Sequence, residues 1–339
     1  MTNETLAGYA NVSLYSAMAV YTIAMLCFAG YLAGLLPARD RAAERTAEVA
    51  ADRELVAAGA AGAETDTTSS ASAAGPARPV RGGLPDDADV PSRARAAAGI
   101  GATTTWLGGM LLLLSVVLRG LSVQRWPLGN MFEFSVMGSM FTSIAFSIWA
   151  TRRDLRWLGL FITGPILLVL GMAVRVWYTE AAEVLPSLQS YWLIIHVTVA
   201  VLASAIFTLG AAATAVYLVK DAFARSGRRS VLDRFPDGPA LERTAYGLHI
   251  VAFPLWTFTL IAGAIWAREA WASYWNWDPK EVWTFVIWVV YAAYLHSRAT
   301  SGISRQTASY IALAGYACII VNFAVVNVFF VGQHSYSGL

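Results

Sequence analysis

Four histidines are the residues of this sequence best suited to ligate a metal centre: His196, His249, His296 and His334. The first three lie within apolar stretches. A histidine inside a membrane helix is polar, costly to bury and usually functional. A packed, hydrogen-bonded histidine with a purely structural role is the alternative for each of them.

Tryptophan is concentrated close to these histidines in the sequence. Of the 13 tryptophans, six lie within residues 266–288: Trp266, Trp271, Trp275, Trp277, Trp283 and Trp288. One interpretation is the aromatic belt found at membrane interfaces, but a belt spreads over all helix ends. The other is a flat apolar platform that stacks on a large planar ligand, with Asp278, Lys280 and Glu281 as polar anchors.

Other groups that could do chemistry are few. Glu133 lies at the start of an apolar run, where a carboxylate is costly unless it is paired. Arg119 and Arg125 precede it and could form an ion pair with it, or could bind carboxylates of a ligand by bidentate hydrogen bonds. Cys27 and Cys318 lie far apart in apolar stretches and read as small core hydrophobes.

The elements that must position these residues are membrane helices. With 57% hydrophobic and 14% charged residues, the chain differs from a soluble domain, in which about a quarter of residues are charged. The net charge of +2 gives no field to attract nucleic acid. Eight apolar runs predict an all-α, polytopic membrane protein: 11–36, 98–118, 131–150, 157–175, 191–219, 244–266, 283–297 and 307–331.

The distribution of basic residues predicts the orientation of these helices. One set of connections holds 19 of the 24 lysines and arginines, and the opposite set holds five. Basic residues favour the cytoplasmic side, so we expect both termini outside, together with loops 119–130, 176–190 and 267–282. We expect residues 1–36 to form an uncleaved first helix. Residues 37–97 are predicted to be a disordered, Ala-rich cytoplasmic loop with a helical stretch around 42–55.

Helix geometry then sorts the histidines by depth. His196 lies about 8 Å below the outer surface, and His334 follows the last span on the same side. His296 lies roughly 20 Å inward from Trp283, and His249 has a similar depth. The sequence thus predicts an outer pair and an inner pair of histidines.

The sequence resembles a known family, the haem-handling proteins with a tryptophan-rich WWD domain. The resemblance is strongest to the CcsA/ResC component of cytochrome c synthase, which is called CcsB in actinobacteria. It rests on W-A-S-Y-W-N-W-D-P-K-E-V-W at 271–283 and on W-x-x-Y-A-A-Y-L-H-S-R at 288–298. Further matching segments lie at 127–133, 185–196 and 332–339. Three positions depart from the family pattern: Ala272 usually is Gly, Phe132 often is Tyr, and Arg268 commonly is Asn.

The resemblance implies a function and a set of site residues. Residues 98–339 would form a haem-handling membrane domain with an external WWD loop at 266–283. His196 and His334 would ligate haem iron at an outer site, and His296 would do so at an inner site shared with a CcsB/ResB-type partner subunit. His249 matches no ligand of the family. The loop residues expected to contact haem are Trp271, Trp275, Trp277, Asp278 and Trp283.

In the family's mechanism, haem b in transit is presented for thioether attachment to C-x-x-C-H apocytochromes c. The chain would supply no catalytic residue of its own, and whether it counts as an enzyme is open, because it would be one subunit of a holocytochrome c synthase (haem lyase). An external thiol-reducing protein and a bacterial plasma membrane, with the active face outside the cytoplasm, are also implied. A b-type electron-transfer cytochrome and a haem exporter without ligase activity are the rival interpretations.

Overall fold

The computed structural model describes residues 3–61, 90–182, 189–227, 232 and 235–334, with backbone only for 36–48 and 53–61. Every regular element in these ranges is helical, which confirms the all-α prediction. The α-helices are α1 (Glu4–Ala61), α2 (Ser92–Val123), α3 (Met131–Ala150), α4 (Gly159–Arg175), α5 (Tyr191–Arg225), α6 (Gly238–Trp271), α7 (Pro279–Ala299), α8 (Arg305–Ile320) and α9 (Asn327–Phe329). A π-helical segment, η3 (Val321–Val326), joins α8 to α9.

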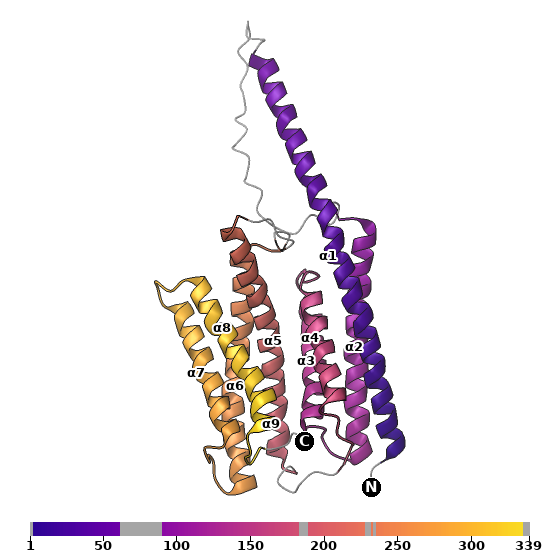
Figure 1. The fold of residues 1–339 in the computed structure, drawn as a ribbon, viewed down its shortest axis with the longest axis vertical. Helices are drawn as coiled ribbons and strands as arrows, with labels where there is room; N and C mark the ends of the chain where they lie inside the picture. Colours follow the sequence, from indigo (N-terminus) through magenta and orange to yellow (C-terminus); the bar gives the residue numbers. More distant parts are fainter. Residues whose placement is uncertain (1–2, 62–89, 183–188, 228–231, 233–234, 335–339) are drawn as a thin grey trace.

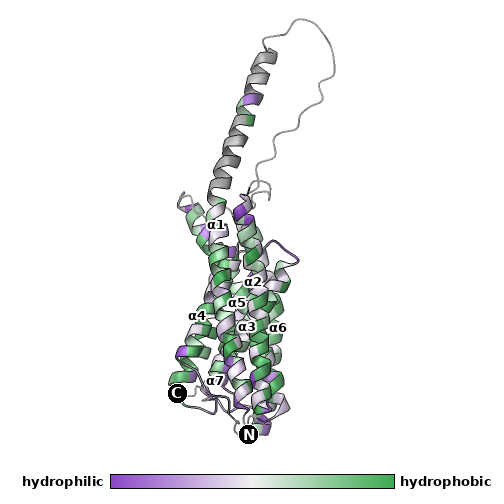
Figure 2. Cartoon of the chain, turned by 90° about the vertical axis from the view of Figure 1, so that its right-hand side faces the viewer, coloured by the Kyte–Doolittle hydropathy of each residue, from purple (hydrophilic) through white to green (hydrophobic). Residues whose placement is uncertain are grey.

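The helices are those of a multi-pass membrane protein. Among the described residues, six helical segments are long and apolar enough to cross a membrane: Glu4–Leu35, Ser92–Val123, Met131–Ala150, Tyr191–Arg225, Gly238–Trp271 and Arg305–Phe329. Each of the eight predicted runs overlaps a helix, and the other two correspond to α4, with 17 residues, and α7, with 21 residues. Hydrophobic residues dominate these helices, and hydrophilic ones gather towards their ends (Figure 2).

The predicted loop at 37–97 is corrected at both ends, whereas the helical stretch expected around 42–55 is confirmed as part of α1. Helix α1 continues without a break to Ala61, and α2 already begins at Ser92. The first stretch is rich in Ala, Glu and Arg and the second in Ala and Arg, all of high intrinsic helix propensity, so a polar composition alone did not imply irregular structure. The central part of the predicted loop, 62–89, lies outside the described residues.

The helices form two groups that lie side by side (Figure 1). Helices α1 to α4, together with one face of α5, pack around one apolar core, and α5 to α8 enclose a second one. The groups meet where α3 and α4 face α5. Phe323 of η3 reinforces this junction, because its ring stacks on Phe134 of α3 at 5.2 Å and meets the edge of Trp177 at 5.3 Å.

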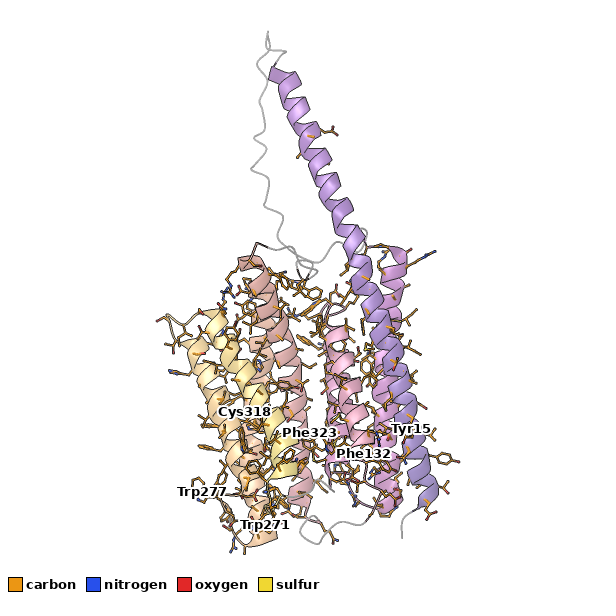
Figure 3. The ribbon with its side chains drawn as sticks, in the orientation of Figure 1. Tyr15, Phe132, Trp271, Trp277, Cys318 and Phe323 are labelled. Carbon is orange, nitrogen blue, oxygen red and sulfur yellow. The ribbon has the colours of Figure 1, made fainter. Side chains whose placement is uncertain are left out.

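The connections expected outside lie at one end of the molecule. The start of α1, the turn between α2 and α3, and the turn between α6 and α7 are all found there (Figure 1). Trp271 and Trp277 lie at this end as well (Figure 3). Side-chain caps fix where the helices begin: Asn130 accepts from Glu133 N at the start of α3, and Ser190 accepts from Trp192 N at the start of α5. We call this end the outer end, following the predicted orientation.

Candidate functional site

The connection between α6 and α7, residues 272–278, contains two residues in the left-handed backbone region. Helix α6 ends at Ala272, whose φ is +59°, and Trp277 has φ of +56°. An L-residue in this region pays a steric cost that glycine avoids, so Ala272 is a strained position. Arg268 donates from Nη1 to the Ala272 carbonyl at 2.6 Å and so holds the turn together.

Two carboxylates organise the rest of this connection. Asp278 caps α7, and Glu281 completes a reciprocal capping box with it. The Glu281 Oε2 atom accepts from the backbone N–H groups of Asn276, at 2.8 Å, and Asp278, at 3.1 Å. Such reciprocal bonds satisfy the amides that the first helical turn leaves without partners. The path of the loop is therefore set by its own side chains.

Asp278 also anchors the segment that follows α9. Its Oδ1 lies 2.9 Å from Nδ1 of His334, and its Oδ2 accepts from Gln333 N at 2.7 Å. Gly332 packs directly against this carboxylate, leaving no room for a side chain. Asn276 adds a bond from Nδ2 to Oε1 of Gln333 at 3.1 Å. The sequence left open whether Asp278 shapes the loop or faces a client, and the structure places it in the loop's framework.

The ionised Asp278 carboxylate orients the His334 ring. Burial alone would raise the pKa of Asp278, but the hydrogen bonds from His334, Lys280 N and Gln333 N outweigh it and hold the pKa below its usual value of 3.8. The carboxylate therefore accepts, and Nδ1 of His334 donates. Nε2 is then the ring nitrogen that could ligate a metal, as in histidines that a carboxylate orients for metal ligation.

His196 has the same arrangement with a different partner. Its Nδ1 lies 2.9 Å from the backbone carbonyl of Thr259 on α6. A carbonyl oxygen can only accept, so Nδ1 must carry the proton and Nε2 the lone pair. The ring lies flat against α6 at Gly263, where a Cβ atom would come within 2.7 Å of the His196 Cε1 atom.

Buried Trp266 brings the two histidines together. Its ring is stacked against His196 with centroids 6.0 Å apart, and it meets the His334 ring at 5.6 Å. Trp271 packs on the other side of this cluster, 4.8 Å from His334 and 4.7 Å from Trp266. The predicted outer pair therefore converges in space, although its members are 138 positions apart in the sequence. Their role as ligands stays a prediction.

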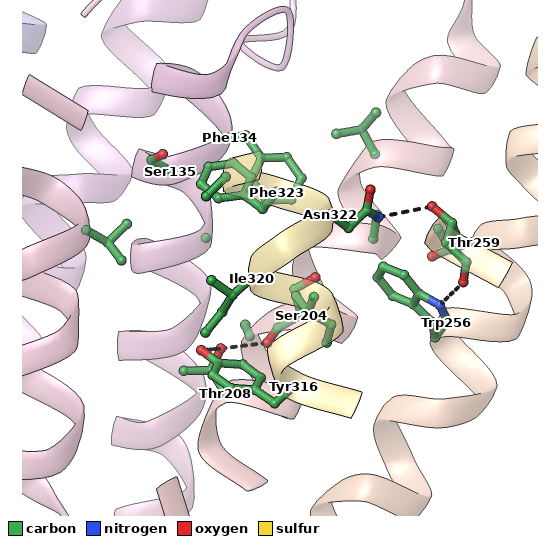
Figure 4. Close-up of a pocket in the computed structure, with 18 of the residues that line it drawn as sticks. Phe134, Ser135, Ser204, Thr208, Trp256, Thr259, Tyr316, Ile320, Asn322 and Phe323 are labelled. Carbon is green, nitrogen blue, oxygen red and sulfur yellow. Dashed lines mark hydrogen bonds between the residues drawn. The ribbon is translucent and has the colours of Figure 1, made fainter. Parts of the chain in front are cut away.

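Both histidines line a cavity of about 850 Å³ between the two helix groups. Its walls are mainly apolar side chains of α3, α4, α5, α6 and α8, and Phe134, Ile320 and Phe323 mark the junction (Figure 4). Polar groups are sparse along it, and Thr208, which accepts a hydrogen bond from Tyr316 at 3.1 Å, is one of them. Trp275, Lys280 and Glu281 of the loop also face this space.

The predicted flat platform of tryptophans is wrong in its geometry. Trp266 and Trp271 meet at an interplanar angle of 67°, and Trp275 and Trp277 meet at 87°. The tryptophans therefore form an angular wall: Trp266 and Trp271 lie at the end of α6, and Trp275 and Trp277 lie in the connection that follows it. Trp277 is 77% exposed. Trp283 lies half-buried on α7 and is not part of the cavity lining.

The inner histidines do not form a comparable pair. His249 is fully buried among the rings of Phe207, Tyr291 and Tyr294, at centroid distances of 5.0–5.9 Å. His296 is exposed on the surface of α7, with Nε2 3.4 Å from the Thr300 hydroxyl. The position of His249 agrees with the structural interpretation, and that of His296 leaves it accessible to a partner subunit.

Glu133 forms a buried ion-pair cluster at the outer ends of α2 and α3. It accepts from Arg119 Nε at 2.8 Å and from two nitrogens of Arg125 at 2.9 Å. The same arginines donate to the carbonyls of Thr179, at 2.6 Å, and Ala182, at 2.9 Å. This geometry favours the ion-pair interpretation over ligand binding. The ring of Phe132 lies under Arg119 Cζ, 4.8 Å from its centroid.

Three contributors to the site were not recognised in the sequence. Thr259 acts through its backbone carbonyl, so its side-chain type gave no signal. Gly263 could have been found, because it lies 14 residues after His249, as Gly210 lies 14 residues after His196. Asn322 shares the cavity wall with Lys280, but it comes from η3, and irregular helices have no simple sequence pattern.

Comparison with known proteins identifies relatives over most of the chain. The profile of a family described as "Cytochrome C assembly protein" matches residues 103–334. The matched region contains the complete helices that carry His196, His249 and His296, and it ends at the fourth histidine, His334.

Individual relatives agree with the profile. "Cytochrome c biogenesis protein CcsA" of Chlamydomonas reinhardtii is 31% identical over 236 residues, which cover 68% of this chain and 66% of the relative, just under two thirds. The protein of the same name from Guillardia theta is 30% identical, covering 71% of this chain and 86% of the relative. That of Parasynechococcus marenigrum is 30% identical, covering 73% and 88%.

Proposed function

Since the chain belongs to the cytochrome c assembly protein family and has a role in cytochrome c biogenesis, we propose that it is the haem-handling subunit of a cytochrome c synthase. In this proposal it moves haem b to the outer end and presents it for thioether attachment to C-x-x-C-H apocytochromes. The observation that carries the proposal is the convergence of His196 and His334 on one apolar cavity. Nδ1 of each ring is already hydrogen-bonded to an oxygen atom of the protein.

The residues present suit haem as a substrate. A volume of about 850 Å³ falls within the roughly 300–1,000 Å³ of small-molecule sites. The apolar walls match the porphyrin ring, and two imidazoles match the axial positions of its iron. The Thr259 carbonyl and the Asp278 carboxylate fix the tautomers of these imidazoles, which is the usual contribution of groups behind metal ligands.

The chain would contribute position rather than acid–base or nucleophilic chemistry. Each client thiol adds its sulfur to one vinyl carbon and a proton to the other, so a C–S bond replaces a C=C π bond without net oxidation. Holding the vinyl groups near the loop at 266–283 makes this step effectively intramolecular. Proximity of this kind lowers the activation barrier by at most about 7–11 kcal/mol. Trp271, Trp275, Trp277, Asp278 and Trp283 would shape the surface that the client approaches.

The proposal also includes partners and a location. His296 would ligate haem at an inner site together with a CcsB/ResB-type subunit, which its exposure on α7 permits. An external thiol-reducing protein would keep the client cysteines reduced. The active face would lie outside the cytoplasm of a bacterial cell, because the outer end carries the fewer basic residues.

One rival is less well supported by the structure. A b-type electron-transfer cytochrome with two haems needs a second pair of facing histidines. His249 lies inside an aromatic core cluster and His296 lies on the surface, so the two do not face one cavity.

The second rival, a haem exporter, is favoured by the length of the cavity, whose lining runs from Leu232 near the inner end to His334 at the outer end.

Maturation of a reporter cytochrome separates these functions. Co-expression of the chain and its partner subunit with a C-x-x-C-H reporter should give covalently bound haem, whereas the chain with His196→Ala should not, and His249→Ala serves as the matched control. An exporter predicts that haem supplied outside restores maturation to the His196→Ala strain. Failure of the wild-type pair to attach haem to the reporter would contradict the synthase proposal.

A further inference from the structure

Lys280 is a cation placed in the wall of the apolar cavity. It lies in the first turn of α7, two residues after Asp278, and its Nζ donates to the backbone carbonyl of Asn322 at 2.8 Å. It lines the large cavity together with His196 and His334. It also lines a small recess shared with Asp278, Gly332 and His334, so it is a close neighbour of the predicted ligand His334.

Within the described residues, no carboxylate lies within 4 Å of the Lys280 ammonium. The Oδ atoms of Asp278 accept hydrogen bonds from His334 Nδ1, from Gln333 N and from the backbone N–H of Lys280 itself. The Oε2 atom of Glu281 receives the N–H groups of Asn276 and Asp278. A carbonyl oxygen cannot neutralise an ammonium, and charges shielded from water are normally paired. The Asp278 carboxylate acts on the ammonium only at a distance, so the site lacks an anion in direct contact with Lys280.

Asn322 provides a second, independent sign of a missing ligand group. Its side chain is 5% exposed and faces the same cavity. Its Nδ2 donates to Thr284 Oγ1 at 3.2 Å, but its Oδ1 is buried without a hydrogen-bond partner. A buried acceptor without a donor costs about 1–3 kcal/mol, and such atoms call for an explanation, for example a ligand.

The π-helical segment explains why these two groups meet. Asn322 is the second residue of η3. A π-turn shifts the backbone register, and such segments occur frequently at functional sites. Here the backbone carbonyl of Asn322 accepts from Lys280 Nζ, while its side-chain amide donates to Thr284 Oγ1. Lys280, Thr284 and Asn322 thus form one polar patch in an otherwise apolar wall.

We propose that Lys280 and Asn322 bind a carboxyl group of the ligand held between His196 and His334. A carboxyl group offers acceptor oxygens to the ammonium and, when protonated or joined by a water molecule, a donor to Asn322 Oδ1. This inference rests on the proposed function, in which the ligand is haem and the carboxyl group is a propionate. Lys280 is then a positioning residue: it fixes the rotation of the ring about the axis through the two histidines, and hence the place of the vinyl groups.

Haem and haem dimethyl ester, in which both propionates are blocked, provide the test. We expect the purified wild-type complex to bind haem roughly tenfold to a hundredfold more tightly than the diester, the range for hydrogen bonds to a charged group. Lys280→Met should remove this preference by weakening haem binding alone, and Lys280→Arg should retain part of it. Arg175→Met, which removes an exposed cation at the outer end, is the control.

The outcomes distinguish the two levels of the proposal. If the wild type binds haem and the diester equally well, or if Lys280→Met weakens both to the same extent, the role of Lys280 is overturned while the haem site stands. If the wild-type complex binds neither compound, the proposed function fails and the inference fails with it. The comparison of the two ligands on wild-type protein needs no variant, so misfolding of Lys280→Met cannot hide the answer.

Discussion

Helices α5 and α6 contain two contacts of the same kind at different depths. At the outer end His196 of α5 packs against Gly263 of α6, and deeper in the bundle His249 of α6 packs against Gly210 of α5. On each helix the histidine and the glycine are 14 residues apart, or about 21 Å along the axis. In both contacts a Cβ on the glycine would approach the imidazole Cε1 closely, at 2.7 Å and 2.6 Å.

The two contacts differ in what surrounds the imidazole nitrogens. Nδ1 of His196 donates to a carbonyl, and the ring borders the large cavity. Nδ1 of His249 is buried without a partner, its Nε2 lies 3.3 Å from the Thr214 hydroxyl, and three aromatic rings enclose it. Equal helix packing thus produces one histidine suited to ligation and one that is only packed. The difference comes from the cavity and from the second histidine, His334.

The largest effect is expected from the histidines themselves. His196→Ala and His334→Ala should each reduce the haem retained by the purified complex to near background, because one of two axial ligands is lost. His249→Ala should retain the wild-type haem content per folded protein. Haem quantified against total protein measures this contrast, and a loss with His249→Ala equal to that with His196→Ala would remove the distinction between the two contacts.

The group behind His334 should have the next largest effect. Asp278→Asn keeps the shape of the capping residue but removes the charge that orients the imidazole, so we expect haem affinity to fall by roughly 10–100-fold, as for other groups behind metal ligands. Haem titration of the apo complex measures it. The control is Asp154→Asn, an exposed ion pair at the opposite end of the bundle, which should leave affinity unchanged.

The glycines test the comparison most directly. Gly263→Ala and Gly210→Ala each force a shift of the facing imidazole, and overpacking of this kind costs typically about 1–3 kcal/mol. Both variants should therefore lower the thermal midpoint by similar amounts. Only Gly263→Ala should also change haem affinity and the absorption spectrum. A spectral change of the same size in Gly210→Ala would show that the inner contact also faces bound haem.

The smallest effect is expected for His249→Leu. Replacing a buried imidazole that has an unsatisfied nitrogen by an apolar side chain of similar size can be nearly neutral. We expect a change in the free energy of unfolding below about 1 kcal/mol and full reporter maturation. Thermal unfolding in detergent, with maturation measured in parallel, checks this; loss of maturation with a normal thermal midpoint would assign His249 a function.

The parts of this structure that follow from hydrophobic length were predictable from the sequence. Each of the eight apolar runs overlaps a helix, and the depth of His196 follows from helical rise alone. The contacts that define the site were less accessible. The bond between His334 and Asp278 joins residues 56 positions apart, and that between His196 and Thr259 involves a backbone atom.

The errors have equally specific causes. The flat tryptophan platform failed because Trp266 and Trp271 come from the end of α6, whereas Trp275 and Trp277 come from the irregular connection after it, and residue type alone does not set the angles at which these rings meet. The helical stretch around 42–55 was correct, but the loop was predicted to begin too early, because low hydrophobicity was given more weight than the helix propensity of alanine and glutamate. Local propensity and tertiary contacts, rather than composition, decide both regions.

Ligation of one haem iron by both His196 and His334 is the central claim, and absorption and electron paramagnetic resonance spectra of the purified complex test it most directly. The wild type should give the low-spin signature of two imidazole ligands. His196→Ala and His334→Ala should each lose that signature and regain it when free imidazole is added, whereas His249→Leu should keep it throughout. Spectra of His196→Ala and His334→Ala identical to the wild type without imidazole would contradict the claim.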